Sequence, residues 1–414
     1  MQPRRIHAAI LLAITLGALP CPVPGSHAGA GKAPAAQQNA SVLGATRVTV
    51  TGRRLLVNGQ PFQVRGVGYA PTPIGDDVRY DWPYGDYFTA EHAAIYSRDL
   101  PLLRDMGANT VRLWGWKYDS PEHGPFLDAA HNGGSRPIYV IVSYWLGAGR
   151  DIHSPAGRQA IVDEFTQMVA IHKDHPAVLM WAIGNELNAS WMYGDSDDLF
   201  SLIDEMAAAA HAEEGESYHP VTTPLCDGPS PTSLIDTIAA RDPQVPNLDV
   251  WSVQVYRGPS FGSLFVDYAA VSGKPLAITE YGIDAYDMAH GTEYELIGTP
   301  YQATYAEALW KEIAANPEVC AGGAIMAYSD EWWKGANGAE PPGGGCPEGD
   351  AGFHSVCGYT NLAHPDGFSN EEWWGIVRPV KNGDSPDIMQ KRAAYHRLRS
   401  LWTSSVYVPC VMRQ

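Results

Sequence analysis

The sequence predicts an α/β protein, a (β/α)8 TIM barrel with an N-terminal β-hairpin and long βα loops. The first observation is that strand-like apolar runs alternate with helical patterns, which is the order of a parallel sheet covered by helices. The second is that two of the apolar runs end in a glutamate, as happens where buried parallel strands open into a cleft. With 414 residues and 45% hydrophobic side chains, the chain is large enough for one such barrel with long loops.

The first 28 residues have the features of a secretory signal peptide. These features are Arg4 and Arg5, an apolar run over 8–19 and the small-residue site Ser26-His27-Ala28. We therefore expect a secreted or periplasmic protein. A lipid anchor on Cys21 is less favoured, because Pro20 directly before it departs from the lipoprotein pattern. Residues 29–44 are rich in Ala, Gly, Gln and Ser and predict a disordered linker, which leaves 45–414 as one folded domain.

A short β-ribbon is expected where the folded domain begins. The segments 47–50 and 54–57 flank a turn, and Asn58-Gly59 is a strong hairpin signal before 60–62. In a barrel such a ribbon would close the bottom.

Eight strands and eight helices are predicted to follow. The strands cover 63–69, 109–114, 138–144, 177–184, 221–225, 250–256, 276–280 and 323–328. The helical patterns cover 90–106, 126–130, 157–173, 197–214, 233–240, 261–271, 301–315 and 387–402. The fifth strand has the least regular pattern, because Pro220 and Pro224 interrupt it.

Two glutamates stand at the ends of predicted strands. The apolar run 177–183 leads to Glu186, and the run 275–278 leads to Glu280. Catalytic groups of α/β barrels lie at the carboxyl ends of the strands, so the two side chains are expected to meet at the barrel mouth. Glycoside cleavage needs such a pair, since one carboxyl protonates the leaving oxygen while the other attacks the sugar or activates water. For either glutamate alone, the alternative is a strand-end salt bridge.

The segments HPAVLMWAIGNE and ITEYG resemble the acid/base and nucleophile motifs of the clan A glycoside hydrolases, which are retaining (β/α)8-barrel enzymes. The resemblance implies that Glu186 is the acid/base and Glu280 the nucleophile, at the separation of about 5 to 5.5 Å that retaining enzymes use. Within the clan, SRDLPLLRDMGANTVRLW, GGAIMAYSDEWW and EEWWGIV look most like family 2 catalytic barrels and β-1,3-glucanosyltransferases. Only a linker and a hairpin precede the first predicted strand, so we expect no jelly-roll domain of the family 2 type.

Two polar residues near the glutamates are candidates for binding the substrate. Arg112 lies among apolar strand residues, and a buried charge needs a partner. The resemblance implies that Arg112 keeps the nucleophile ionised, with a core-to-surface salt bridge as the alternative. Asn185 would contact the sugar hydroxyl beside the reacting carbon, with a loop cap as the alternative.

Five aromatic residues are further substrate-binding candidates. The resemblance implies a tyrosine bound to the nucleophile at Tyr256, and a sugar platform at Trp332 or Trp333. Tyr69 and Tyr144 also end predicted strands. For all five rings, ordinary packing in the core or at the rim is the alternative.

Three long connections follow strands and carry many aromatic residues. They cover 70–89, 189–196 and 329–384. Long loops in compact domains are usually functional or disordered. Tyr and Trp, at 21 and 13 residues, outnumber the 9 Phe, and rings with a polar group suit partly wet surfaces. We expect these loops to form the walls of a sugar cleft, with a core rich in Trp and Tyr as the alternative.

Several other partners and cofactors are not indicated. The net charge of −18 argues against nucleic-acid binding, and after the signal no apolar run approaches the ~20 residues of a membrane span. No Cys or His pattern has zinc-site spacing, so we expect no metal and no cofactor. Helix ends and an N-cap explain the pair His172 and His175 and the acidic residues Asp195, Asp197 and Asp198.

The cysteine count predicts a disulfide in an exported protein. Five cysteines follow the signal, so one must stay unpaired. The expected pair is Cys346 with Cys357, which stand at the end of a Gly-rich loop.

These features predict a retaining glycoside hydrolase that cleaves β-glycosidic bonds of a glucan or related glycan by double displacement. Its partner is an oligo- or polysaccharide substrate. One alternative is a transglycosylase that uses the same covalent intermediate, and another is a non-catalytic carbohydrate-binding barrel. The second alternative would not need both Glu186 and Glu280. The sequence leaves the linkage, exo or endo action and the oligomeric state open.

Overall fold

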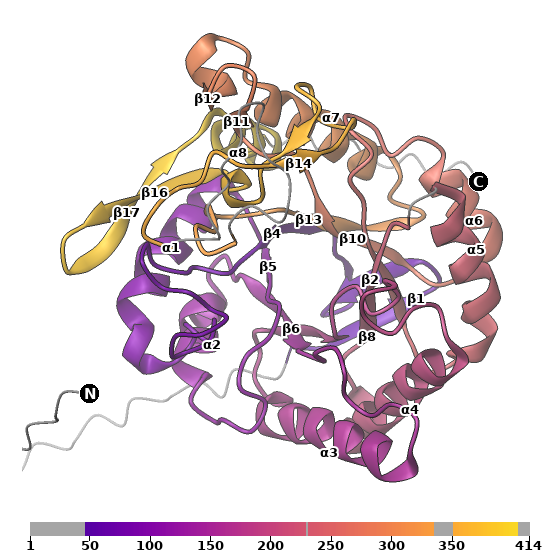
Figure 1. Cartoon of the computed structure of the whole chain (residues 1–414). Coiled ribbons are helices and arrows are strands. Elements are labelled where there is room, and N and C mark those ends of the chain that lie inside the picture. Colours follow the sequence, from indigo (N-terminus) through magenta and orange to yellow (C-terminus); the bar gives the residue numbers. More distant parts are fainter. Residues whose placement is uncertain (1–45, 229–230, 335–350, 405–414) are drawn as a thin grey trace, which may run out of the picture. The chain divides into compact units, whose positions relative to one another are not determined.

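The computed structural model describes residues 46–228, 231–334 and 351–404. Within them, eight parallel strands close into a barrel (Figure 1), as the sequence predicts. The strands are β4 (Val64–Gly68), β5 (Thr110–Arg112), β6 (Tyr139–Tyr144), β7 (Val178–Ile183), β8 (Val221–Cys226), β9 (Val250–Gln254), β10 (Leu276–Tyr281) and β13 (Cys320–Ile325). They pair in this order around the ring, and β13 pairs with β4 to close it.

The chain divides into two units, Met1–Val42 and Leu43–Gln414. The first lies outside the described residues, so the signal peptide over 1–28 and the linker over 29–44 stay predictions. The described residues of the second unit contain the barrel.

The predicted strands agree with β4 to β10 to within a few residues, including the fifth strand with its internal Pro224. The eighth strand begins earlier than predicted, at Cys320 rather than 323. Its glycines explain the difference, because they let β13 approach its neighbour closely. A Cβ atom on Gly322 would lie 2.3 Å from the carbonyl oxygen of Val64 in β4.

Eight α-helices of the described chain surround the strands as a ring (Figure 1). They are α1 (Ala93–Met106), α2 (Gly124–His131), α3 (Pro155–His172), α4 (Asp197–Glu214), α5 (Pro231–Arg241), α6 (Leu264–Val271), α7 (Tyr301–Ala315) and α8 (Ala393–Thr403). The short 3-10 helices are η1 (Ala90–His92), η2 (Asn132–Gly134), η3 (Gly215–Ser217), η4 (Asp242–Gln244), η5 (Tyr294–Ile297) and η6 (Glu371–Trp373). Helices α3 and α4 begin at serine N-caps, where Ser154 and Ser196 accept hydrogen bonds from backbone N–H groups.

The main core fills the layer between the strands and the helices. Fully buried side chains from both layers meet there, such as Val111 and Trp181 from strands and Phe165 and Met206 from helices. Each buried apolar side chain of this size stabilises the fold by about 1.5–3 kcal/mol. This packing fixes where each strand ends, and therefore which side chains reach the barrel mouth.

A three-stranded antiparallel sheet closes the bottom of the barrel, as predicted. It consists of β1 (Val48–Thr51), β2 (Arg54–Val57) and β3 (Gln60–Pro61). The side chains of Val48 and Leu55 pack with residues near the amino ends of the strands, including Val64 and Tyr139.

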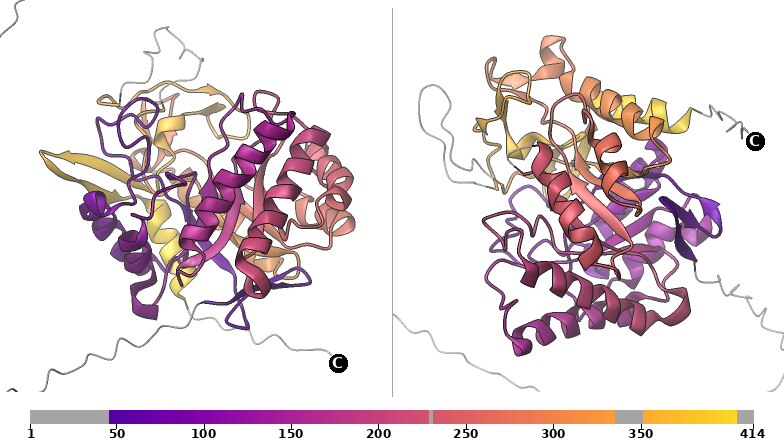
Figure 2. Two further views of the ribbon diagram at one scale, coloured as in Figure 1. Left: turned by 90° about the horizontal axis from the view of Figure 1, so that it is seen from below. Right: turned by 90° about the vertical axis from the view of Figure 1, so that its right-hand side faces the viewer.

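Three small hairpins are added on the loops and before the last helix. They pair β11 (Tyr286–Asp287) with β12 (Thr292–Glu293), β14 (Tyr359–Thr360) with β15 (Phe368–Ser369), and β16 (Val377–Asn382) with β17 (Ser385–Lys391). The last hairpin projects from the barrel (Figure 2). It corrects the predicted helix over 387–402, which begins only at Ala393, because pairing with β16 overrides the local helical pattern.

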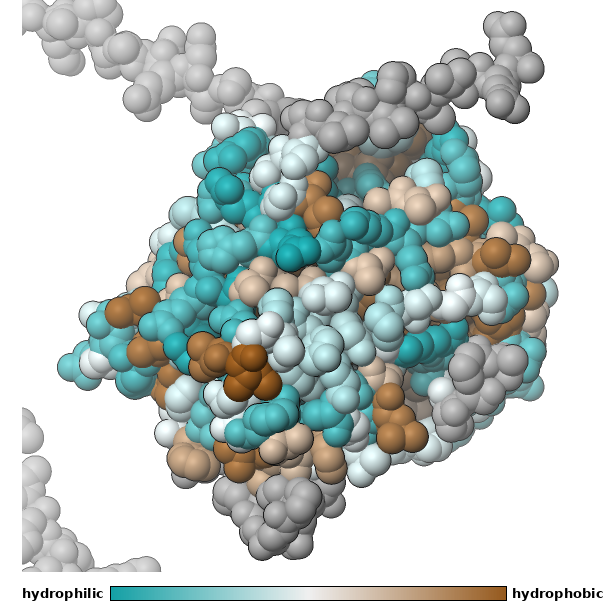
Figure 3. Space-filling model, turned by 90° about the horizontal axis from the view of Figure 1, so that it is seen from above, coloured by the Kyte–Doolittle hydropathy of each residue, from teal (hydrophilic) through white to brown (hydrophobic). Residues whose placement is uncertain are grey.

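One face of the surface is largely hydrophilic, with small separate hydrophobic patches (Figure 3). Single exposed apolar residues of this kind are common on proteins. In the part of the chain that the structure describes, no helix combines the length and the apolar character needed to cross a bilayer.

Candidate active site

A tight turn after β7 holds Glu186. Gly184 has a φ of +64° and Glu186 a φ of +51°. A Cβ atom on Gly184 would lie 2.5 Å from the side chain of Leu187, so only glycine fits there. The N–H of Glu186 donates to the carbonyl oxygen of Pro224 in β8, at 2.9 Å. The turn therefore fixes Glu186 at the carboxyl end of the barrel, in a backbone conformation that non-glycine residues adopt at a cost.

Glu280 lies near the end of β10 and accepts hydrogen bonds from four side chains. Its Oε1 accepts from Arg112 at 2.8 Å, Trp114 at 3.0 Å and Gln254 at 2.8 Å, and its Oε2 accepts from Tyr256 at 2.6 Å. The residue Glu280 is 6% exposed and Arg112 is fully buried. Hydrogen bonds to the charged form stabilise the negative charge of Glu280.

Asn185 links the two strand ends. Its Oδ1 accepts from Arg112 at 2.5 Å and from Gln254 at 2.6 Å, the same two residues that donate to Glu280. The amide N–H groups of Asn185 have no acceptor within the described residues and remain available to a ligand. Arg112 and Gln254 therefore hold the Asn185-Glu186 segment and Glu280 in one fixed arrangement.

The electrostatic environment separates the two glutamates. Burial and the negative charge of Glu280 raise the pKa of Glu186 to about 7. Burial and the same negative charge raise the pKa of Tyr256 well above its ordinary value, so its hydroxyl stays protonated and donates. Glu186 is thus protonated up to a pH of about 7. The neighbouring carboxylate, Glu280, accepts hydrogen bonds from four side chains.

A second charged group lies close by, on the loops after β13. Lys334 contacts Glu331 at 2.8 Å and Glu371 at 3.2 Å, and Tyr359 donates to Glu371 at 2.9 Å. The charges of Lys334 and Glu371 both act on the pKa of Glu186, in opposite directions. This group therefore forms part of the surroundings of the carboxylate pair.

The comparison with protein families decides the assignment of the barrel. A family model described as "Glycosyl hydrolases family 2, TIM barrel domain" matches residues 48–340. The chain belongs to this family. This confirms the predicted likeness to family 2 barrels, whereas the likeness to β-1,3-glucanosyltransferases stays a prediction.

Curated relatives match the family 2 barrel at low identity. A β-glucuronidase of Mus musculus is 24% identical over 274 residues, which cover 64% of this chain and 38% of that protein. A β-galactosidase of Arthrobacter sp. (strain B7) is 25% identical over 271 residues, which cover 60% of this chain and 24% of that protein. The chain thus matches less than half of the length of either relative.

Solved structures show the same fold as the family 2 barrel. A β-glucuronidase from Bifidobacterium dentium, complexed with coumarin-3-O-glucuronide, has a TM-score of 0.55 at 19% identity, covering 87% of this chain and 49% of that chain. A Bacteroides uniformis β-glucuronidase has a TM-score of 0.56 at 16% identity, covering 87% of this chain and 38% of that chain.

Of the two residues predicted as the sugar platform of the family 2 barrel, Trp332 and Trp333, the first lies in a group of rings. Trp332 stacks on His354 with ring centroids 4.6 Å apart, and His354 stacks on Trp373 at 3.4 Å. Trp374 of the same loops packs edge-on against Tyr256, the donor to Glu280, with ring centroids 4.9 Å apart. The roles of Trp332 and Trp333 stay predictions.

Tyr69 and Tyr144 do not join the site. The hydroxyl of Tyr69 donates to Asp99 on α1 at 3.1 Å, and that of Tyr144 donates to Glu164 on α3 at 2.5 Å. Both side chains therefore point from the barrel wall into the helix layer, where they are buried. This corrects the expectation that they contact the substrate, because side chains alternate along a strand and these two face outward.

Sequence reasoning missed four side chains that build the site. Trp114 and Gln254 each lie two residues from a predicted site residue, Arg112 and Tyr256, and alternation along a strand places such pairs on one face. That spacing is a signal that would have found them. Lys334 and Glu371 come from long loops, where no periodicity indicates which side chains meet.

The described residues contain no group of three or more His, Cys, Asp or Glu side chains arranged to hold a metal ion. The acidic residues Asp195 and Asp197 instead pair with Arg241. Cys226 and Cys320 are free thiols. Cys346 lies outside the described residues, so its pairing with Cys357 stays a prediction.

Proposed function

We propose that this family 2 barrel is a retaining β-glycoside hydrolase in which Glu280 is the nucleophile and Glu186 the acid/base. The observation that carries the proposal is the difference between the two carboxyl groups. Glu280 accepts four hydrogen bonds that stabilise it as an anion, whereas the pKa of Glu186 is raised to about 7. A retaining enzyme needs one carboxylate and one carboxylic acid at this stage of the reaction.

The first step breaks the glycosidic bond. Glu186 gives its proton to the departing oxygen while Glu280 attacks the anomeric carbon and forms a covalent glycosyl ester. The negative charge of Glu280 is consumed in this ester, which removes one of the causes of the raised pKa of Glu186. Glu186 is then a carboxylate and ready to act as a base.

The second step releases the sugar. Glu186 takes a proton from water, the oxygen of that water attacks the anomeric carbon, and Glu280 leaves as a carboxylate. The net reaction adds one water molecule across the glycosidic bond and restores both side chains. A sugar hydroxyl in place of water would give transglycosylation through the same intermediate.

Asn185 and Arg112 position these reactants. Because the Oδ1 of Asn185 already accepts two hydrogen bonds, its N–H groups are left as donors, which suits the hydroxyl beside the anomeric carbon. Arg112 holds Glu280 and Asn185 together, with one guanidinium nitrogen on each.

We further propose that the bound sugar is uncharged, although several matched relatives are named as β-glucuronidases. The cations of the cleft already have carboxylate partners: Arg112 has Glu280 at 2.8 Å, and Lys334 has Glu331 and Glu371 at 2.8 Å and 3.2 Å. A uronate would bring another carboxylate beside these groups, and a buried charge without a partner is costly. A neutral sugar avoids this cost.

Exposed aromatic residues support a glycan as the substrate. Tyr80, Trp82 and Tyr84 follow β4, Trp145 follows β6, Trp191 follows β7, and all five are more than half exposed. Loops after barrel strands lie on the side of the carboxylate pair. Such rings can cover the faces of further sugar units, which fits a β-glucan or related β-linked glycan. Export of the enzyme, based on residues 1–28, is part of the same proposal.

One experiment tests the hydrolytic mechanism. Proton NMR of the reaction with an aryl β-glycoside should show the β-anomer of the free sugar first, and the α-anomer only after mutarotation. Chromatography of the products from a β-glucan oligosaccharide then separates hydrolysis from transfer, since transfer also yields longer chains. Appearance of the α-anomer first would contradict the retaining mechanism.

A second experiment tests the charge of the sugar. The 4-nitrophenyl β-glycosides of glucose, galactose, mannose, glucuronic acid and galacturonic acid share one leaving group. We expect kcat/KM for the preferred neutral sugar to exceed that for either uronide by at least about 100-fold. A preference for a uronide would refute this part of the proposal. In the variant Glu371→Gln, Lys334 loses one of its two carboxylate partners. The ratio of kcat/KM for the neutral sugar to kcat/KM for the uronide should therefore become smaller.

A further inference from the structure

A cavity of about 530 Å³ opens at the bottom of the barrel, away from the carboxylate pair. Its lining includes Gln63 and Asn109, which directly precede β4 and β5, and Pro137, which lies two residues before the start of β6. Because the strands are parallel, these residues mark the end opposite to Glu186 and Glu280. The volume is in the range of about 300–1,000 Å³ that small-molecule sites occupy.

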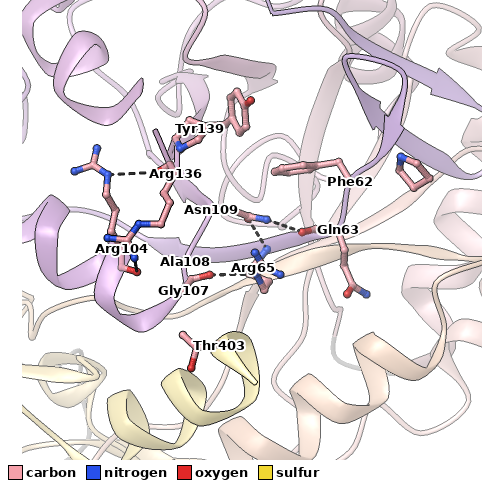
Figure 4. A pocket seen from close by; sticks show the side chains of 12 residues that line it. Phe62, Gln63, Arg65, Arg104, Gly107, Ala108, Asn109, Arg136, Tyr139 and Thr403 are labelled. Carbon is pink, nitrogen blue, oxygen red and sulfur yellow. Dashed lines mark hydrogen bonds between the residues drawn. The ribbon is translucent and has the colours of Figure 1, made fainter. Parts of the chain in front are cut away.

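Three arginines line this cavity: Arg65, Arg104 and Arg136. Figure 4 shows Arg104 and Arg136 on one side and Phe62 on the other, with Arg65 between them. Arg65 comes from β4, Arg104 from the last turn of α1, and Arg136 from the loop before β6. Three separate segments therefore bring positive charge to one place.

These arginines lack the counter-charge that most others have. Within 46–228, 231–334 and 351–404, the arginines without an ion pair to a carboxylate are Arg47, Arg53, Arg65, Arg104 and Arg136. The chain has 46 acidic side chains and 28 Lys and Arg, so it has more than enough carboxylates to pair with every Lys and Arg. Segments 1–45 and 405–414 contain no Asp or Glu. Three of the five unpaired arginines share one cavity.

Part of their hydrogen-bonding capacity serves the fold. Arg65 donates to the carbonyl oxygen of Gly107 at 3.1 Å, just after α1, and Arg104 donates to that of Ala130 in the last turn of α2 at 2.9 Å. Cations near helix carboxyl ends are stabilising. Among the described residues, the guanidinium of Arg136 donates only to the carbonyl oxygen of Arg104, at 3.5 Å.

The remaining N–H groups are open to a ligand. A guanidinium has five N–H donors, and only one nitrogen of Arg65 and one of Arg136 have an acceptor within the described residues. Burial lowers the pKa of Arg65 and of Arg104, and the charge of Arg136 lowers that of Arg104 further. An anion in the cavity would relieve this repulsion.

One wall of the cavity is aromatic. The rings of Phe62 and Tyr139 meet edge to face with centroids 5.4 Å apart, and both residues line the cavity. In such a site, the guanidinium groups can bind an oxyanion while the aromatic face beside them covers a sugar ring.

We propose that this cavity is a second binding site, which takes the oxyanion group of an acidic sugar on Arg65, Arg104 and Arg136 and the sugar ring against Phe62. The site is separate from the catalytic cleft and does not depend on the proposed reaction. The carboxylate of a uronic acid and a sulfate ester share the chemistry that the three arginines recognise.

Calorimetric titration of the full chain with digalacturonate tests the proposal, with cellobiose, sodium sulfate and inorganic phosphate as further ligands. We expect digalacturonate to bind at low salt and less tightly at high salt. Arg136→Gln should weaken binding roughly tenfold, because it removes a charged donor. The matched control is Arg47→Gln, since Arg47 is exposed, unpaired with any described carboxylate and outside the cavity. Equal affinity in both variants, or no binding of any anion, would overturn the site.

Phe62→Ala separates an acidic sugar from a free oxyanion. It should weaken digalacturonate and leave sulfate and phosphate unchanged. Sulfate or phosphate binding as tight as that of digalacturonate, with no effect of Phe62→Ala, would overturn the assignment to a sugar. Aryl glycoside hydrolysis should be the same in wild type and Arg136→Gln, which also shows that the variant is folded.

Discussion

The carboxyl ends of β7 and β10 carry the same residue type in opposite surroundings. At the end of β10, Glu280 accepts hydrogen bonds from four side chains. After β7, the carboxyl group of Glu186 accepts none from the described residues, and burial and the charge of Glu280 raise its pKa to about 7. The donors around Glu280 stabilise an anion, whereas the site around Glu186 favours a neutral acid. The difference teaches that the surroundings, and not the residue type, assign the two roles.

Removing the anion should have the largest effect. Glu280→Ala deletes the group that attacks the anomeric carbon, and we expect kcat to fall by about 10⁴-fold or more. Steady-state kinetics on an aryl β-glycoside measures the loss. Because the first step itself is blocked, a better leaving group should not restore the rate, and activity within tenfold of wild type would refute the role of Glu280.

Removing the acid should have a smaller effect that depends on the substrate. Glu186→Ala should slow hydrolysis of glycosides with poor leaving groups by about 10²–10⁴-fold, the usual contribution of general acid–base catalysis. A dinitrophenyl glycoside needs no protonation of its leaving group, so its covalent intermediate should form quickly. Azide should then speed the release step and yield the β-glycosyl azide. An α-glycosyl azide, or no rescue, would contradict the assignment.

Removing one hydrogen-bond donor from Glu280 should test how much its surroundings contribute to catalysis. Tyr256→Phe removes the only donor to Oε2 of Glu280 among the described residues and keeps the ring. We expect kcat/KM to fall by about 10–100-fold, as for the loss of a hydrogen bond to a charged group. The control is Tyr144→Phe, which removes a hydroxyl of the helix layer and should leave kcat/KM within about twofold.

The pH dependence of kcat/KM should show the ionisation of Glu186. Glu186 must hold its proton at the start of the reaction, so kcat/KM should fall as the pH rises through about 7. In Glu186→Gln with a dinitrophenyl glycoside, this basic limb should disappear. The same sign applies to stability: a pKa raised above its value of 4.5 in the unfolded chain means that the free energy of unfolding falls as the pH rises towards about 7. A wild-type profile that is flat between pH 6 and 9 would refute the role of Glu186.

The sequence predicted the barrel well because its strands are defined by burial. An apolar run such as the one in β7 is fully buried in the structure, and even Pro224 did not prevent β8 from pairing. The helix predicted over 387–402 was wrong in its first part, since β17 exists only through its pairing with β16. Local pattern cannot indicate a strand whose partner and position come from tertiary contacts.

By itself, the sequence determined the alternation of strands and helices, the two glutamates at strand ends, and the likeness to family 2 barrels. Only the tertiary structure decided that Trp114 and Gln254 join Arg112 and Tyr256 on Glu280, and that Tyr69 faces the helices instead. It also decided that three arginines distant in the chain share one cavity. The physical reason is that hydrophobic periodicity fixes which residues are buried. Closure of the barrel and the course of its loops fix which polar groups meet.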